Sequence, residues 1–477
     1  MTYFIDEILC RESNQTLLSY KFEAEDIHMW PLIRFKILKK AMEKMLNVQP
    51  IYLQPSGRSL FERIRYLENV LRRGSPRAND KLYEILIFSG GSSNFMINGK
   101  YRDRVNGYFA QMLPETTLVV EDIFKNTVFL PKEFKNTLFH DHFIMRAKLL
   151  SKLRKPSKSD NQSIGAFIEY ISELFPEVDV QTRQLAKREL ENMACKLSIL
   201  RGVYFDLFER YKPRLMFIED GSYGDRSYII KWAKEAGIKT AEFQHGFAGS
   251  SHISYNYGVT GFSTEYKKYL PDFLLCYGGY WADQIKHPAK PIIIGNPHLA
   301  EMRRSFQRHK QSKSIVLVAT SGGDYRNTNK VVGELIELLN NDEYQIILRP
   351  HPQEAQAAYE RYGVLFEKGI EPDIMSKGYG NLIAALENAD YFVVEAGSTV
   401  AYEAAYFDVP VILIENGSTK EYIRDNMFTI ARNGRDIYEF IRASNNQEQV
   451  DKEYIFCSGW QQNYLNFVKD ILHDSNN

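Results

Sequence analysis

The sequence predicts an α/β protein in which two doubly wound parallel-sheet domains follow a helical N-terminal extension. Short apolar runs alternate with amphipathic segments of helical period, first over 83–278 and again from 314 onwards. A charged segment near 283–314 separates the two series. A chain of 477 residues is also too long for a single hydrophobic core, because cores stop growing near ~250–300 residues.

The expected domains follow from these boundaries. Residues 1–80 contain helical stretches such as PLIRFKILKKAMEKML at 31–46 and form the extension. The first domain is predicted over 81–290 and the second over 291–450. Residues 451–477 are expected to form a C-terminal helix that packs back on the first domain.

The first series begins with the predicted strands YEILIFSGG at 83–91 and TTLVVEDIF at 116–124. A single long helix is predicted over 182–211. RLMFIED at 214–220, the helix after it and KTAEF at 239–243 make a strand–helix–strand unit, which is typical of a parallel sheet. Two further strands are expected in FLLCYG and PIIIGNP.

The second series repeats the pattern with the strands SIVLVAT, YQIILRPHP, ADYFVVEAGS and VPVILIENG. Two such domains facing each other would enclose a cleft. Ligands of open parallel sheets bind beyond the carboxyl ends of the strands. The residues that follow each strand are therefore the candidates for a functional site.

The overall composition excludes some classes of protein. Sixty basic and 60 acidic residues give no net charge, which argues against a nucleic-acid partner. No apolar run is long enough to span a membrane, and the acidic N-terminus MTYFIDEILCRES does not have the pattern of a secretory signal. The cysteines make no CxxC pattern and are expected to be reduced thiols in a cytoplasmic protein: Cys10, Cys195, Cys276 and Cys457.

FIEDGSYG at 217–224 places Glu219 and Asp220 at the end of a buried strand. One carboxylate there suits a general base, and a second beside it would raise its pKa by like-charge repulsion. Alternation along the strand puts the two on opposite faces, so only one is expected in the site. The alternative is that Asp220 caps the following helix.

EFQHGFAGSSH at 242–252 follows the next strand. Its glycines allow a ligand to approach the backbone closely. His245 is positioned to hydrogen-bond an acceptor hydroxyl or a phosphate, or else it is a structural loop histidine.

Two motifs of the second domain suit an anionic ligand. GGDYRNTN places Gly322 and Gly323 before a helix N-terminus, where free N–H groups favour a phosphate, although an ordinary turn fits equally well. LRPHPQE places Arg349 and His351 around a proline that stiffens the loop. A cation and a histidine there suit a diphosphate or a departing phosphate.

VVEAGSTVAYEAAYFD supplies a further anion site. Gly397, Ser398 and Thr399 open a helix, so hydroxyls and free N–H groups meet there. Glu395 or Glu403 is a candidate for holding ribose hydroxyls. The alternative is an ordinary capped helix.

No metal is expected. HDH at 140–142 would place two histidines on one face of a strand, but no third ligand is evident nearby, which favours a surface pair. No D-x-D motif is present.

The motifs Glu219-Asp220-Gly221, His351-Pro352 and Ser398-Thr399 together resemble those of GT-B glycosyltransferases of bacterial capsule and lipopolysaccharide synthesis. Their order is similar to that of bacterial sialyltransferases that use CMP-sugars. The resemblance implies two Rossmann-like domains that transfer a CMP-activated acidic sugar, such as a sialic acid or Kdo, to a surface-polysaccharide acceptor.

In this resemblance Asp220 is the base that deprotonates the acceptor, which lies against the first domain. His351 contacts the donor phosphate, which Ser398 and Thr399 bind in the second domain. It also implies a nucleotide-sugar donor, a glycan or lipid-linked acceptor, and no metal or other cofactor, because protein groups neutralise the leaving nucleotide.

Three other functions stay open. QHG at 244–246 also resembles capsule-synthesis proteins such as Kdo transferases and CDP-glycerol or CDP-ribitol phosphotransferases. UDP-N-acetylglucosamine 2-epimerases share the fold and a similar strand–Gly-Ser–helix near 393–405. The third is a non-catalytic member of a capsule-assembly complex.

The segment 146–158 interleaves basic residues with leucines and contains no acid. Such a segment suits peripheral contact with anionic lipid at the inner face of the cytoplasmic membrane. The alternative is a solvated helix face followed by a loop.

Overall fold

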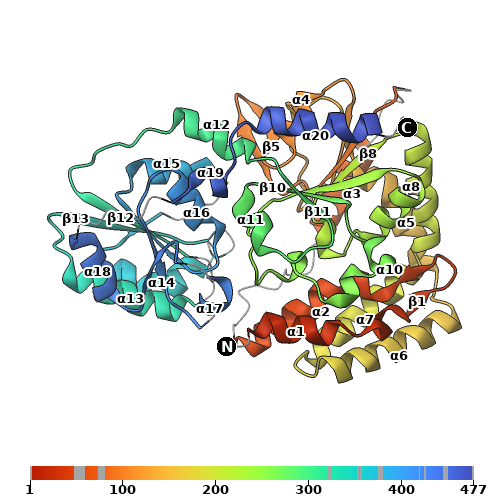
Figure 1. Cartoon of the computed structure of the whole chain (residues 1–477), viewed down its shortest axis with the longest axis horizontal. Helices are drawn as coiled ribbons and strands as arrows, with labels where there is room; N and C mark the ends of the chain where they lie inside the picture. The colour runs from red at the N-terminus through yellow and green to blue at the C-terminus, as the bar shows by residue number, and fades with distance from the viewer. Residues whose placement is uncertain are drawn as a thin grey trace.

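A computed structural model of the chain shows two α/β domains side by side, with N-terminal helices against the first (Figure 1). It describes residues 3–47, 60–73, 81–320, 324–351, 354, 357–373, 380–417, 419–423, 426–443 and 450–474. Three residues of the expected motifs, Gly322, Gly323 and Pro352, lie outside the described residues. Among the described residues no helix is both long and apolar enough to cross a bilayer.

Within the described residues, the sheet of the first domain has seven parallel strands. Their order is β11 (Lys290–Ile293), β10 (Phe273–Cys276), β9 (Lys239–Phe243), β8 (Leu215–Ile218), β3 (Ile85–Ser89), β6 (Thr117–Glu121) and β7 (Thr137–Phe139). The sheet thus includes residues beyond 290, where the sequence analysis begins the second domain. The strands β8 and β3 are buried on both faces, which explains their continuous apolar runs.

Helices cover both faces of this sheet. On one face, α8 (Leu197–Tyr211) and α9 (Ser227–Glu235) pack on Leu86, Phe88, Met216 and Ile218. On the other face, α4 (Gly107–Met112) and the C-terminal α20 (Trp460–Asp474) pack on Ile85, Ile87, Leu215 and Phe217. The last helix of the chain therefore lies on the first domain.

The predicted single helix over 182–211 is wrong. The structure has two helices, α7 (Val180–Ala194) and α8, interrupted at Cys195 and Lys196. The two helices bury different partners, since α7 packs against α2 (Met29–Met45) and α6 (Lys158–Leu174) while α8 packs against the sheet. Amphipathic spacing continues across the interruption, so the sequence pattern does not reveal it.

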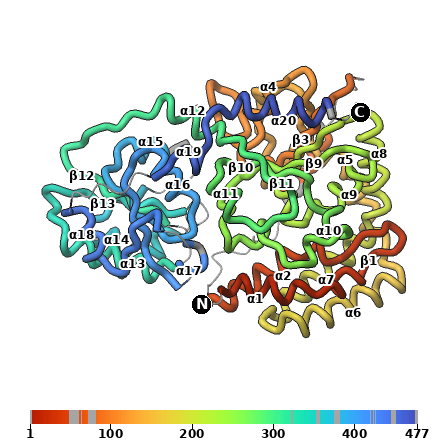
Figure 2. Tube along the Cα trace, in the orientation of Figure 1, coloured from red at the N-terminus to blue at the C-terminus, as the bar shows by residue number. Residues whose placement is uncertain are grey.

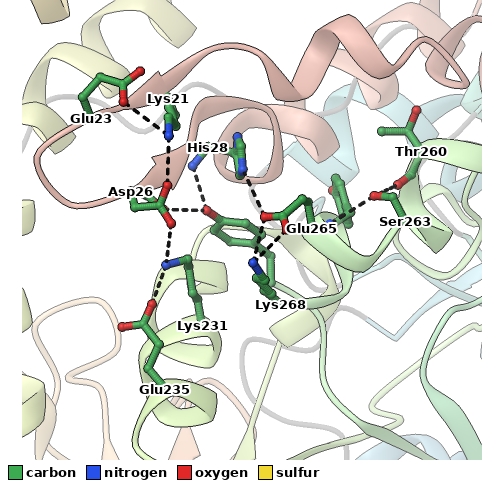
Figure 3. A network of polar contacts seen from close by, with 12 residues as sticks. Lys21, Glu23, Asp26, His28, Lys231, Glu235, Thr260, Ser263, Glu265 and Lys268 are labelled. Atoms are coloured by element: carbon green, nitrogen blue, oxygen red, sulfur yellow. Dashed lines mark hydrogen bonds and ion pairs between the residues drawn. The ribbon is translucent and has the colours of Figure 1, made fainter.

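The N-terminal extension contains α1 (Phe4–Glu12), the hairpin of β1 (Lys21–Phe22) and β2 (Ile27–His28), α2, and α3 (Leu60–Arg73). Figure 2 shows α1 and α2 running along the lower side of the first domain. Polar contacts fasten the hairpin to α9, as Asp26 pairs with Lys231 at 3.4 Å and Lys231 with Glu235 (Figure 3). The extension therefore belongs to the packing of the first domain.

In the described part of the second domain, six parallel strands form the sheet. Their order is β14 (Glu371–Pro372), β13 (Tyr344–Arg349), β12 (Ser314–Ala319), β15 (Tyr391–Glu395), β16 (Val411–Ile414) and β17 (Thr429–Ala431). One face carries α13 (Tyr325–Leu338), α14 (Ala358–Glu367) and α18 (Gly434–Arg442). The other carries α15 (Gly380–Asn388) and α16 (Thr399–Tyr406).

The two domains share an aromatic core. Trp281, on α11 (Gly279–Gln284) of the first domain, lies 4.8 Å from Tyr402 of α16, measured between ring centroids. The hydroxyls of Tyr280 and Tyr402 are 2.8 Å apart. The prediction of two doubly wound Rossmann-like domains in a GT-B-like arrangement is confirmed.

Candidate active site

The two carboxylates after β8 take opposite directions, as strand alternation predicts. Glu219 is buried and accepts hydrogen bonds from the Gly90 N–H at 2.7 Å and from Asn106 Nδ2 at 3.0 Å. Burial, with the charges of Asp103 and Asp220, raises the pKa of Glu219 to about 8. Glu219 therefore lies inside the first domain and is not exposed to a substrate.

Asp220 has a left-handed backbone with φ of 59°, and its side chain is 46% exposed. It makes no capping hydrogen bond to the short helix Gly221–Tyr223, so the capping alternative is wrong. The carboxylate instead meets His245, whose Nε2 lies 3.1 Å from Asp220 Oδ1. The strands β8 and β9 are neighbours in the sheet, which explains why these two strand ends meet.

A chain of polar side chains continues behind His245. The Tyr255 hydroxyl lies 3.4 Å from His245 Nδ1 and donates to Glu242 Oε1 at 3.3 Å. Glu242 also accepts from the Ser222 N–H at 2.9 Å. Burial raises the pKa of Glu242 to about 8, so this carboxyl keeps its proton at neutral pH.

The N-terminal extension holds the loop that carries Tyr255. The guanidinium of Arg34 is buried and donates to the Ile253 and Asn256 carbonyls, both at 2.6 Å. Its other partner is the buried Glu12, whose Oε2 lies 2.8 Å from Arg34 Nη2. An ion pair of the extension thus fixes the backbone next to the site.

A second buried cluster lies at the ends of β6 and β7. His140 Nδ1 is 2.6 Å from Asp122 Oδ1, and His140 Nε2 is 2.7 Å from the Tyr204 hydroxyl. Arg226 also pairs with Asp122. The prediction of a surface pair on a strand is wrong for His140, because the strand ends at Phe139 and His140 begins the helix α5 (His140–Leu150).

A metal ion is one possible use of such clusters, but over the described ranges no group of three or more His, Cys, Asp or Glu side chains could hold one.

In the second domain, His351 follows β13, and its N–H donates to the Thr320 hydroxyl at 3.0 Å. Burial lowers the pKa of His351, against the charges of Glu354 and Glu395, so the imidazole is neutral at pH 7. The Arg349 guanidinium is also buried and donates to Asp373 at 2.6 Å.

Gly397, Ser398 and Thr399 join β15 to α16, as the sequence predicts. The φ of Gly397 is 92°, which explains the glycine. Ser398 occupies the N-cap position, but its side chain makes no capping hydrogen bond. Both hydroxyl-bearing residues are half-buried at the N-terminus of the helix. An anion can accept from such hydroxyls and from the helix N–H groups.

The two carboxylates proposed to hold a ribose are buried. Glu395 accepts from the Thr328 hydroxyl at 2.7 Å. Burial raises the pKa of Glu403, and the charge of Arg104 from the first domain opposes that rise. Neither carboxylate lies at the surface, and their role in ribose binding stays a prediction.

The two halves of the site meet at α16. Phe247 follows His245 in the QHGF turn, and its ring centroid lies 6.3 Å from that of Tyr402 on α16. The helix that presents Ser398 is therefore packed against the loop that presents His245. Sequence analysis missed Tyr255, Glu242 and Arg104, although Glu242 lies in a stretch that it singled out.

No family model matches the sequence, and no curated protein was found to match it. Solved structures show distant likeness. The MnaA protein of S. aureus with UDP is 12% identical, with a TM-score of 0.46, over 82% of this chain and 97% of that one.

Two more structures match to a similar extent. A UDP-GlcNAc 2-epimerase from Neisseria meningitidis, bound to UDP-GlcNAc, is 12% identical with a TM-score of 0.44, over 82% of this chain and 99% of that one. The wall teichoic acid polymerase TagF is 13% identical with a TM-score of 0.42, over 87% and 98% respectively. Likenesses this distant leave the reaction of this chain open, and the fold description rests on its own strand order and cores.

Proposed function

We propose that this protein is a metal-independent glycosyltransferase that moves a sugar from a nucleotide donor to a surface-polysaccharide acceptor. The pairing of Asp220 with His245 at the carboxyl edge of the first sheet is the observation that carries the proposal. A half-exposed carboxylate held by a histidine suits a general base for an acceptor hydroxyl.

In the proposed reaction, Asp220 takes the proton of the acceptor hydroxyl as its oxygen attacks the anomeric carbon of the donor. The bond from that carbon to the phosphate oxygen breaks, and the nucleotide leaves with the bonding electrons. His245 Nε2 lies 3.1 Å from Asp220 Oδ1 and would donate to it when Nε2 carries a proton. This contact orients the carboxylate and leaves Oδ2 for the acceptor.

The second domain would hold the leaving phosphate. Ser398, Thr399 and the N–H groups at the start of α16 are suitable donors to its oxygens. His351 follows β13, which is separated from β15 by β12 in the same sheet, and it is the candidate to assist departure of the phosphate. The order of motifs favours a CMP-activated acidic sugar as the donor in a cytoplasmic reaction.

A second candidate function is transfer of a polyol phosphate from a CDP-polyol. The place of His245 beside Asp220 favours it, because a histidine and an aspartate together can accept the proton of a polyol hydroxyl. In this reaction the acceptor oxygen attacks the phosphorus of the polyol phosphate, and CMP leaves. Both candidate reactions therefore release CMP, and only the product tells them apart.

The first test is thermal unfolding of the full chain with CMP, CDP, UDP or GDP. A ligand at ~100 times its Kd adds about 2.7 kcal/mol to the free energy of unfolding, which visibly raises Tm. A shift with CMP supports the proposal, whereas a shift with UDP alone would favour hexosamine transfer or epimerisation. Absence of any shift would contradict nucleotide binding.

The second test is turnover with a CMP-activated acidic sugar and, separately, with CDP-glycerol, each with an acceptor glycan. Glycosyl transfer is expected with the first donor. Phosphoglycerol transfer instead would select the second candidate. If neither donor is consumed, both candidate functions are contradicted.

A further inference from the structure

Helix α3 packs on the first domain with only one face. The Tyr66 hydroxyl donates to Asp141 of α5 and accepts from Lys148 at 3.0 Å. Val70 is 1% exposed and packs with Ile123. Residues 66 and 70 are one helical turn apart, so this face of α3 is the buried one.

The opposite face of α3 exposes large apolar side chains. Spacings of three and four residues place positions 64, 67 and 71 along one stripe of the helix. The exposed fractions in this stripe and beside it are 74% for Phe61, 55% for Ile64, 42% for Leu67 and 69% for Leu71. Isolated exposed apolar residues are normal, but a contiguous stripe marks an interaction surface.

Exposed basic side chains lie on α3 and on the segment that begins with α5, the helix against which α3 packs. Arg65 lies on α3 itself and Arg146 on α5, while Lys152 and Lys155 lie in the segment after α5 and Lys158 begins α6. None of the five has an ion pair within the described part of the chain. Two exposed leucines lie among them, Leu149 at 52% and Leu153 at 85% exposure.

We propose that this surface docks on an anionic lipid bilayer. The α3 surface is defined as Phe61, Ile64, Leu67 and Leu71 together with the exposed basic residues of 146–158. A basic amphipathic helix lies in a bilayer interface with its apolar face among the acyl chains and its cations near anionic headgroups. The proposal does not depend on which reaction the protein catalyses.

The charge pattern selects this occupant over a second copy of the chain. A symmetric dimer through α3 would bring the same patch of both copies together. Arg65 of the two copies, and the cations of the neighbouring α5 segment, would then approach one another, and like charges at short range repel. A bilayer with anionic headgroups supplies the opposite charge and the apolar phase at once.

The test is co-sedimentation of the full chain with phosphatidylcholine vesicles, with and without phosphatidylglycerol. Wild type is expected to bind the anionic vesicles, and more weakly as salt rises. Ile64→Glu with Leu71→Glu should lower that binding by more than tenfold. Neutralising Lys152, Lys155 and Lys158 to Gln should lower it about fivefold per lysine.

The matched control places two glutamates on exposed helical positions elsewhere, Leu185→Glu on α7 and Val364→Glu on α14, which are 44% and 52% exposed. This variant is expected to bind like wild type. Unchanged binding of the Ile64 and Leu71 variant would overturn the proposal. So would equal binding to neutral vesicles, or a wild-type dimer that the same variant converts to monomer.

If the variant Ile64→Glu with Leu71→Glu does not fold, a second measurement tests the same surface. Leu71→Trp should shift its fluorescence to shorter wavelength on addition of anionic vesicles, because the indole enters the interface. Val364→Trp should show no added shift. Equal responses from the two would overturn the proposal.

Discussion

The two strand edges that form the candidate site are built differently. At the edge of the first domain, Asp220 and His245 already contact each other, and the buried carboxyls Glu219 and Glu242 are held by hydrogen bonds. At the edge of the second domain, Ser398 stands at a helix N-terminus without capping it. The first edge therefore holds its polar groups in contact with one another, which suits the proposed proton transfer, whereas the second leaves a helix N-terminus that suits the proposed phosphate.

The largest expected effect comes from removing the Asp220 carboxylate at the edge of the first domain. Asp220→Ala should lower turnover by about 10²–10⁴-fold, because general-base catalysis contributes that much. Nucleotide binding, measured by the ligand-dependent rise in Tm, should stay nearly unchanged, since the donors assigned to the nucleotide lie in the other domain. Asp225→Asn, a nearby carboxylate, is the control and should keep turnover.

If Asp220→Ala loses both turnover and nucleotide binding, the assignment of the base to the first edge and of the nucleotide to the second is contradicted.

The next effect tests what holds the first edge in place. Arg34→Met should lower the free energy of unfolding by about 3–5 kcal/mol, because it leaves the Glu12 carboxylate buried without its partner. Urea unfolding measures it. Lys368→Met breaks an exposed pair with Glu337 and should cost at most about 1 kcal/mol.

The double variant Glu12→Gln with Arg34→Met sharpens this result. Its cost should be smaller than the sum of the single costs, since no unpaired charge stays buried. Additive costs would show that the ion pair does not act as a unit.

The third effect concerns the second edge. Ser398→Ala with Thr399→Ala should raise the Kd of the nucleotide by about 10–100-fold for each hydrogen bond lost, because a hydrogen bond to a charged group contributes ~1.5–3 kcal/mol. Calorimetric titration measures Kd, and Tm without ligand should change little because Ser398 makes no cap. A large fall in that Tm with unchanged Kd would give both residues a structural role.

The smallest effect, counted per pH unit, is a pH dependence at the first edge. Burial raises the pKa of Glu242 to about 8, above its unfolded value of about 4.3. Between these two pH values the folded state keeps a proton on Glu242 that the unfolded state has lost. The free energy of unfolding therefore falls as pH rises towards 8. The side chain introduced by Glu242→Gln does not titrate. The free energy of unfolding of this variant should therefore rise relative to that of wild type by about 1.4 kcal/mol per pH unit, and the difference should level off above pH 8.

Urea unfolding at a series of pH values measures this difference. Glu337→Gln, on an exposed side chain, is the control and should follow wild type. Parallel curves for wild type and Glu242→Gln would contradict the raised pKa.

Much of the fold could be predicted because both sheets are parallel and covered on both faces. Strands such as Leu215–Ile218 and Val411–Ile414 are buried throughout, so each appears as a continuous apolar run. The hairpin of β1 and β2 could not be predicted from such runs, since each strand has two residues. The interruption between α7 and α8 at Cys195 could not be predicted either, because the helical spacing of apolar residues continues across it.

The sequence by itself determined which chemical groups follow each strand: Asp220 after β8, His245 after β9, and Ser398 after β15. That order is local and follows from the alternation of apolar runs and turns. Only the tertiary structure decided which groups meet. Asp220 contacts His245 because β8 and β9 are adjacent in the sheet, and Arg34 reaches the neighbouring loop across more than 200 positions. Such contacts depend on strand order and helix packing, which no local pattern specifies.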